Sequence, residues 1–438
     1  MDEATAGENA LKDHYGRMLG LKKPWCVNDV KLFISEKRLE IALGYAEGAS
    51  FECPECARLC WLHDHAPQRQ WRHLDAMGFE TLLSARVPRV KCPDHGVSTV
   101  AVPWAGAHSR FTLAFEAFAI QILQACAGIQ AAAELLGLPW RSLQGIMDRA
   151  VERGLKRREL EGLNAVGFDE PERSGDSQPQ AARRASAARQ KSFKRGQSFI
   201  SHMCDLRQPR VIEVVEGRDQ DCARQLWQSL PEAISSRVLD ATMDMSAGFA
   251  AAARIEAPQA RITFDKYHVA SHMNKAVDQT RRTEHKELMA TGDDALKGKR
   301  YLFLYNPEGF SASQSQDFEE LLKVNLKAGR AWAYTELFTE FWQQPDRESG
   351  KRFIIEWCAK VRRSRLGQMK KVAAMLERHL DGLLNYFASR LTNALCEGFN
   401  SRIQQLKTAA RGFRSFANYR TRIFFFLGSL DLSFSLSH

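Results

Sequence analysis

The chain has 438 residues, and its 62 lysines and arginines outnumber its 52 aspartates and glutamates, for a formal net charge of +10. Hydrophobic residues make up 44% and charged residues 26%, which is ordinary globular composition and excludes a largely disordered chain. The sequence has no apolar run of the roughly 18 residues that a membrane helix needs, and its first ten residues, MDEATAGENA, do not resemble a secretory signal. We therefore expect a soluble, intracellular protein of about three domains with a polyanionic partner.

The N-terminal third of the chain divides by composition into three regions. Residues 1–45 are predicted to be a mixed, partly helical lead-in. Residues 46–105 hold a cysteine cluster together with short β-like pieces such as residues 81–90. Residues 110–160 repeat apolar side chains at three- and four-residue spacing, which is typical of helices.

The remainder, residues 163–430, is predicted to be one larger domain. Short apolar runs alternate with helical stretches up to residue 269, which indicates a mixed α/β sheet. Long charged helices are expected over about 270–390, followed by one more helix and a basic, aromatic tail. Residues 171–190 combine Pro, Ser, Gly, Ala and Arg and are predicted to be a surface loop.

Two short-gap pairs of metal-binding residues stand in the cysteine cluster. Cys53 pairs with Cys56, and Cys92 pairs with His95, with 35 residues between the pairs. Zinc takes four tetrahedral nitrogen or sulfur ligands, and a two-residue gap lets both members of a pair reach one ion. We predict a closed structural Zn²⁺ site in preference to buried free cysteines or disulfides. The alternative candidates for the fourth ligand are Cys60, His63, His65 and His73.

A helix-turn-helix is predicted between residues 129 and 157. Ile129–Leu136 forms the first helix, Gly137 begins the turn, and Pro139 stands where a second helix begins. The side of this second helix that faces the first is predicted to carry Leu143, Ile146 and Met147. The outward side, which would read a DNA major groove, is predicted to carry Arg141, Ser142, Gln144 and Arg149. The alternative is an ordinary helical hairpin.

Three acidic residues are candidates for a metal-dependent active site. Asp169 and Asp244 each end an apolar run that is typical of a buried strand, and Glu397 lies on a late amphipathic helix. Carboxylates at the ends of adjacent strands can converge on Mg²⁺, which prefers oxygen ligands. Periodicity alone leaves four rivals open, Asp205, Asp219, Asp221 and Asp240.

The order of these parts, with three further motifs, resembles a known family. The motifs are Asp265-Lys-Tyr-His268-Val, Thr392-Asn393 followed by Glu397-Gly-Phe-Asn400, and Gly412-Phe413 followed by Asn418-Tyr419-Arg420. Over residues 50–430 the chain is similar to bacterial insertion-sequence transposases of the ISL3 family. The resemblance implies a multidomain α+β protein in which a zinc-binding module and a helix-turn-helix precede a ribonuclease-H-like α/β catalytic core. A helical insertion interrupts this core.

The same resemblance implies roles for the acidic residues. Asp169, Asp244 and Glu397 match the three catalytic acids of a DDE enzyme, which hold two Mg²⁺ ions. Asp265 and His268 match a D-x-x-H signature and are expected to support the site. In one departure from the family pattern, residues 171–190 separate the first aspartate from a basic-glycine segment.

Three stretches of the chain carry six lysines or arginines each and no acidic residue, namely 181–196, 360–371 and 402–422. Such stretches neutralise phosphate and supply sequence-independent affinity for DNA. Phosphate contacts are expected from Lys194, Arg195, Lys407, Arg411 and Arg414. The alternative is a set of solvated helix faces.

Together these features predict a DNA transposase that acts in the bacterial cytoplasm in association with the nucleoid. Its partners are expected to be terminal inverted repeats, target DNA and at least one more copy of the chain, because the reaction joins two DNA ends. Cleavage and strand transfer are expected to depend on Mg²⁺. The alternatives are a non-catalytic zinc and helix-turn-helix regulator derived from a transposase, and a Mg²⁺-dependent nuclease without strand transfer.

Overall fold

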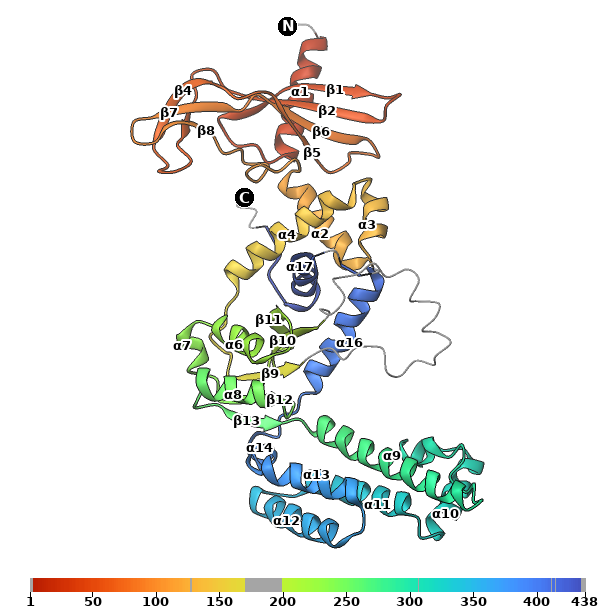
Figure 1. Cartoon of the computed structure of the whole chain (residues 1–438). Coiled ribbons are helices and arrows are strands. Elements are labelled where there is room, and N and C mark those ends of the chain that lie inside the picture. Colours follow the sequence, from red (N-terminus) through yellow and green to blue (C-terminus); the bar gives the residue numbers. More distant parts are fainter. Residues whose placement is uncertain are drawn as a thin grey trace. The chain divides into compact units, whose positions relative to one another are not determined.

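The protein is described by a computed structural model that forms two compact units (Figure 1). The described residues are 3–126, 128–169, 199–305, 307–410, 412–413 and 415–434. The first unit comprises Met1–Arg158 with Leu430–His438, and the second comprises Glu159–Ser429. The loop predicted at 171–190 lies outside the described residues.

Two four-stranded sheets form the N-terminal part of the first unit, with strand orders β1-β2-β6-β5 and β3-β4-β7-β8. The elements are α1 (Glu3–Met18), β1 (Trp25–Phe33), β2 (Arg38–Tyr45), β3 (Ser50–Glu52), β4 (Leu59–His65), β5 (Arg69–Arg72), β6 (Glu80–Ala85), β7 (Pro88–Cys92) and β8 (Gly96–Thr99). Alternate residues of β2 are buried, as expected for a strand with one face on a core. Because β2 pairs in parallel with β6, the lead-in and the cysteine region share one sheet.

Three helices complete the first unit, α2 (Leu113–Ala125), α3 (Ile129–Leu136) and α4 (Trp140–Arg157). The predicted first helix of the helix-turn-helix coincides with α3. Gly137 ends it in the left-handed conformation, at φ 62°, which glycine adopts without the steric cost of a Cβ. Pro139 is the N-cap of α4. The prediction that Leu143, Ile146 and Met147 face inward is confirmed, since all three are buried.

A five-stranded mixed sheet, of order β11-β10-β9-β12-β13, forms the centre of the second unit. Its strands are β9 (Ala165–Asp169), β10 (Ile200–Asp205), β11 (Arg210–Glu216), β12 (Asp240–Met243) and β13 (Arg261–Phe264). Strands β9, β12 and β13 run parallel to one another, and β10 is antiparallel to both β9 and β11. Every residue of β9 and β10 is buried, as expected for strands covered on both faces. The predicted mixed α/β sheet is therefore confirmed.

Helices cover both faces of this sheet (Figure 1). The helices next to the sheet are α6 (Gln220–Gln228), α7 (Glu232–Ser235), α8 (Ala247–Glu256), α16 (Ala394–Ala409) and α17 (Phe416–Leu427). Phe168 of β9 packs in one core with Trp227 of α6 and Phe249 of α8. On the other face, Ala165 belongs to a second core that includes Ile403 of α16. Adjacent residues of β9 thus reach opposite faces, as the pleat requires.

A helical region stands between β13 and α16. It contains α9 (Lys266–Ala290), η1 (Arg300–Phe303), η2 (Pro307–Gly309), α10 (Ala312–Lys323), α11 (Lys327–Thr339), η3 (Glu340–Gln343), α12 (Arg347–Arg363), α13 (Gly367–Arg378), α14 (Leu380–Leu384) and α15 (Tyr386–Ser389). Its core includes Phe338, Phe341 and Trp357, whose indole N–H donates to the carbonyl of Tyr334 at 2.9 Å. The predicted helices of 270–390 are therefore present. No helix in the described part of the chain is long and apolar enough to cross a membrane.

The prediction of a basic, aromatic tail after the last helix is wrong, because that segment forms α17. The Ser415 side chain caps α17 by accepting a hydrogen bond from the Asn418 N–H. Arg420 donates to Glu213 of β11 at 2.8 Å, and Arg422 is buried. These two arginines are therefore committed to packing α17 on the sheet.

Candidate functional site

Three aspartates follow one another along the carboxyl-terminal edge of the sheet. The register of β9 and β12 pairs Gly167 with Thr242 and, continued to the strand ends, brings Asp169 level with Asp244. The register of β12 and β13 brings Asp265 level with Asp244 in the same way. Residues at one level of neighbouring parallel strands point to the same side, and sites in such sheets form at this edge. The strand ends therefore collect carboxylates at one edge of the sheet.

Glu397 of α16 reaches the same edge from one of the covering helices. Burial of its carboxyl, followed by the negative charges of Asp265 and Asp169, raises the pKa of Glu397 to about 7, although Lys266 opposes this shift. Asp169 is 8% exposed and Asp265 is 2% exposed, so little water screens these charges. The structure thus brings Asp169, Asp265 and Glu397 together.

This acidic cluster has the chemistry of a site for a hard divalent cation. Oδ2 of Asp265 and Oε1 of Glu397 are buried and accept no hydrogen bond. Buried carboxylate oxygens without donors are destabilising unless a cation or a proton compensates them. Mg²⁺ and similar ions bind oxygen ligands of this type, so the residues present fit such an ion.

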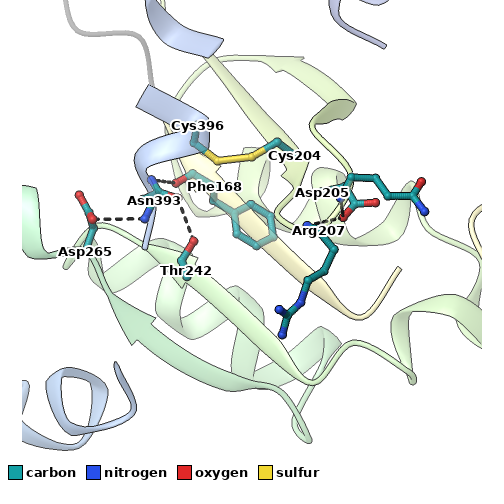
Figure 2. The surroundings of a disulfide bond; sticks show 9 residues. Phe168, Cys204, Asp205, Arg207, Thr242, Asp265, Asn393 and Cys396 are labelled. Atoms are coloured by element: carbon teal, nitrogen blue, oxygen red, sulfur yellow. Dashed lines mark hydrogen bonds between the residues drawn. A yellow bond between two sulfur atoms is a disulfide. The ribbon is translucent and has the colours of Figure 1, made fainter. Parts of the chain in front are cut away.

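Asn393, the N-cap of α16, ties this helix to three strands of the sheet (Figure 2). Its side-chain amide donates to the carbonyl of Phe168 at 2.9 Å, and its amide oxygen accepts from the Thr242 hydroxyl at 2.9 Å. Its backbone N–H donates to Oδ1 of Asp265 at 3.3 Å. Because the Glu397 N–H donates to the Asn393 carbonyl, these bonds determine where the first turn of α16 holds Glu397.

Close packing and a disulfide join α16 to the sheet beside Glu397. A Cβ on Gly167 would lie 2.5 Å from Sγ of Cys396, so only glycine allows this approach. Cys396 forms a disulfide with Cys204 of β10, 192 residues away in the sequence (Figure 2). The neighbouring His202 is buried, and this burial lowers its pKa to about 4, so it is neutral at physiological pH.

Asp244 and His268 lie beside this cluster and are less buried than Asp169 and Asp265. Oδ1 of Asp244 accepts from the Ser246 N–H at 2.9 Å, which leaves its second oxygen for another partner. The charge of Asp244 also acts on His272 of α9, whose pKa is lowered mainly by burial. His268 is half-buried in the first turn of α9.

The four rival aspartates have structural roles. Asp240 begins β12 at the opposite edge of the sheet and pairs with Arg261 at 2.9 Å. Asp205 accepts from two backbone N–H groups at the turn that follows β10. Asp219 caps α6, and Asp221 lies in the first turn of that helix. None of the four is among the acids that raise the pKa of Glu397.

The four predicted zinc ligands converge in the first unit. Sγ of Cys53 lies 3.8 Å and Sγ of Cys92 lies 3.6 Å from Nδ1 of His95, and the sulfurs of Cys56 and Cys92 are 3.7 Å apart. Tetrahedral ligands about 2.3 Å from a zinc ion are separated by roughly these distances. The backbone N–H of Asp94, with smaller contributions from other donors, lowers the pKa of Cys92 to about 6, which favours the metal-binding thiolate. The residues therefore fit a structural zinc ion.

The alternative fourth ligands are separate from this cluster. Cys60 is buried in the core of the first unit, and burial raises the pKa of its thiol. His65 stacks on Tyr45, and His73 hydrogen-bonds to Thr112. His63 is exposed and does not belong to the group of four converging ligands.

The predicted outward face of α4 is only partly outward. Arg141 is exposed and Ser142 is half-exposed. The prediction that Gln144 faces outward is wrong: it is 8% exposed and donates to Asp148, because it lies at the edge of the buried stripe. Arg149 is half-exposed and forms an ion pair with the buried Glu116. Lys407 is half-exposed on α16, whereas Lys194, Arg195, Arg411 and Arg414 lie outside the described residues.

Three family models match consecutive parts of the chain. The zinc-finger of transposase IS204/IS1001/IS1096/IS1165 matches residues 49–95, and the helix-turn-helix domain of transposase family ISL3 matches residues 100–151. The DDE transposase model of the ISL3 family matches residues 190–423, which is more than half of the chain. With the acidic edge and the zinc cluster, these matches define a DNA transposase of the DDE class that binds DNA through its helix-turn-helix. The chain belongs to the ISL3 family of transposases.

Two relatives illustrate the extent of the similarity. The chain is 27% identical over 393 residues to the transposase for insertion sequence element IS1557 of Mycobacterium tuberculosis (strain CDC 1551 / Oshkosh), which covers 83% of this chain and 82% of the relative. It is 21% identical over 366 residues to the transposase for insertion sequence element IS1001 of Bordetella parapertussis, which covers 83% and 85%. The predicted family and enzyme class are therefore confirmed. The domain matches also indicate a structural zinc ion and a catalytic divalent metal.

Proposed function

We propose that the second unit is a ribonuclease-H-like core with a helical insertion. The strand order β11-β10-β9-β12-β13, in which the central strand begins the domain, supports this assignment. The insertion would comprise α9 to α15, close to the predicted 270–390, and α16 would then return the chain to the sheet. This path delivers Glu397 to the edge where β9, β12 and β13 end.

In this proposal Asp169, Asp244 and Glu397 hold two Mg²⁺ ions, and Asp265 supports them as a fourth carboxylate. The burial of Asp169, Asp265 and Glu397 around one another is the single observation that carries it. His268 would assist from the first turn of α9.

Bound there, Mg²⁺ would activate a water or a 3′-hydroxyl for in-line attack on phosphorus. The protein's own contribution is to keep the carboxylates in place, because Asn393 and the packing at Gly167 hold α16 against β9. Since Glu397 is protonated near neutral pH without a cation, cation binding must displace that proton.

The first unit would recognise the terminal inverted repeats of the element. Arg141 and Ser142 stand at the exposed start of α4, where a recognition helix contacts base edges. Lys407, Arg149 and the basic residues outside the described part of the chain would contact phosphate. Joining two ends to target DNA requires at least two protomers, so we propose a homodimer or larger complex on the nucleoid DNA.

The proposal is tested with a labelled terminal-repeat duplex and purified protein. Wild type should nick the duplex with Mg²⁺ and then join the 3′ end to target DNA, whereas Asp169→Asn, Asp244→Asn and Glu397→Gln should bind it but neither cut nor join. Asp240→Asn is the matched control and should stay active, because Asp240 lies at the opposite edge. Cutting by Asp169→Asn at the wild-type rate would contradict the assignment. Cutting without joining by wild type would indicate a nuclease.

A further inference from the structure

A basic, concave face runs along α9 away from the acidic edge. The structure has a cavity of about 350 Å³ there, between α9 and η1. Its polar lining includes Tyr267, Ser271, Asn274, Lys275, Arg282 and Arg300. The residues contributed by α9 recur at three-, four- and seven-residue spacing and therefore share one side of the helix. With a rise of 1.5 Å per residue, this face extends from about 3 Å to about 25 Å beyond Asp265.

The positive charges of this face are held in place by one buried carboxylate. Asp278 pairs with Arg281 at 2.9 Å, with Arg282 at 2.6 Å and with Arg300 at 3.5 Å. One negative charge therefore orients three guanidinium groups, which leaves an excess of positive charge even before Lys275 is counted. Arginines fixed in this way lose little conformational entropy when they bind phosphate.

Exposed aromatic rings accompany these cations. Tyr267 is 61% exposed at the end of the cavity nearest the acidic edge. Tyr301 and Tyr305, also largely exposed, have ring centroids 5.0 Å apart beside Arg300. Large exposed apolar surfaces are unfavourable in water, and aromatic rings next to cations are the surface on which unpaired bases stack.

We propose that this face of α9 binds the unpaired DNA strand that adjoins the scissile phosphate, with a base stacked on Tyr267 and phosphates at Lys275, Arg282 and Arg300. The inference rests on the proposed function, because it places the cleaved DNA at the acidic edge where α9 begins. In intact duplex the bases are stacked on one another, so the rings favour a single strand. An acidic peptide would satisfy the cations but leave the rings without a partner.

The experiment compares two terminal-repeat duplexes with the full-length protein and no added Mg²⁺. One duplex is blunt, and the other carries a short single-stranded extension containing 2-aminopurine beside the cleavage position. Wild type should bind the extended duplex about tenfold more tightly and quench its fluorescence by stacking. Tyr267→Ala should lose both effects, and Tyr267→Phe should keep them because it retains the ring.

The phosphate contacts are tested by the salt dependence of binding to the extended duplex. Removing Lys275 and Arg282 in the double variant Lys275→Gln/Arg282→Gln should lower the slope of log affinity against log salt by roughly 1.4, that is, about 0.7 for each contact on a single strand. Arg237→Gln is the matched control, since Arg237 is an exposed cation that precedes β12 at the opposite edge. It should leave the slope and the preference for the extension unchanged.

Equal affinity of wild type for the two duplexes would overturn the inference, as would an undiminished preference in Tyr267→Ala. A loss in Arg237→Gln as large as that in the double variant would overturn it too, by showing a general effect of charge. If wild type cuts the blunt duplex with Mg²⁺ while any of these results holds, only the inference fails. If wild type neither binds nor cuts terminal repeats, the proposed function fails and the inference fails with it.

Discussion

Asn393 offers a sharp test of how the fold positions the acidic cluster. Its side chain bridges Phe168 of β9 and Thr242 of β12, and all three of these residues are buried. Asn393→Ala removes one donor and one acceptor, and it leaves the Phe168 carbonyl and the Thr242 hydroxyl without those partners. Each buried polar group left unpaired costs about 1–3 kcal/mol, so the expected loss in the free energy of unfolding is about 2–5 kcal/mol.

The activity of Asn393→Ala should fall more than its stability implies. Glu397 lies one helical turn after Asn393, and a displacement of about 1 Å in a catalytic group can cost roughly a hundredfold in rate. Thr242→Val removes only the hydroxyl and should cost about 1–2 kcal/mol. The double variant should then lose less than the sum of the single variants, with a coupling energy of about 1 kcal/mol, because one shared hydrogen bond is counted twice.

Urea unfolding supplies the stabilities, and nicking of the terminal-repeat duplex below the unfolding transition supplies the rates. Asn385→Ala is the control, since the Asn385 amide donates to the Ile262 carbonyl at 2.9 Å in the same unit but away from the acids. It should lose stability while its nicking rate stays near wild type. Strictly additive losses in Asn393→Ala/Thr242→Val, or an unchanged nicking rate in Asn393→Ala, would refute the reasoning.

Three further predictions follow from the two metal sites and the DNA-binding helix. Cys53→Ser should abolish zinc binding in metal analysis of purified protein and unfold residues 50–100, whereas wild type should retain one zinc ion per chain. Arg141→Ala should reduce discrimination between terminal-repeat and random DNA by about 1–3 kcal/mol in competition binding, while equal loss on both DNAs would mean a phosphate contact. Because its neighbours raise the pKa of Glu397 to about 7, cation affinity should fall as the pH drops below 7, and calorimetry at pH 6 in buffers of different ionisation enthalpy should detect proton release on binding.

Features determined by local spacing could be predicted from the sequence. The zinc ligands come as two pairs, Cys53 with Cys56 and Cys92 with His95, and a hairpin can bring such pairs together. The turn at Gly137 is equally local, because a left-handed residue after a short apolar helix favours glycine.

Features that depend on distant contacts could not be predicted. Nothing in the sequence around Cys204 indicates that it meets Cys396, since the pairing depends on how α16 packs on the sheet. The contacts of Asn393 with β9 and β12 depend on the same packing. One signal was present, because a glycine within an apolar strand, here Gly167, is typical of a close approach by another segment.

The two misjudged segments share one cause, which is that periodicity does not define the edge of a buried face. Gln144 lies three residues before Met147 and seven before Val151, so it borders their stripe and is covered with them. In the segment predicted as a tail, Tyr419 and Ile423 have helical spacing, yet the surrounding charges suggested a solvated chain. Glu213, far away in the sequence, neutralises Arg420 there.

The central claim is that Asp169, Asp244, Asp265 and Glu397 surround one divalent metal centre, and metal-directed backbone cleavage tests it most directly. Fe²⁺ in place of Mg²⁺, with ascorbate and peroxide, generates hydroxyl radicals that cut the chain next to the bound ion. We predict cuts near all four residues, which are far apart in the sequence, suppressed by excess Mg²⁺ and lost in Asp169→Asn. Cuts confined to other positions, or cuts that persist unchanged in Asp169→Asn, would contradict the account.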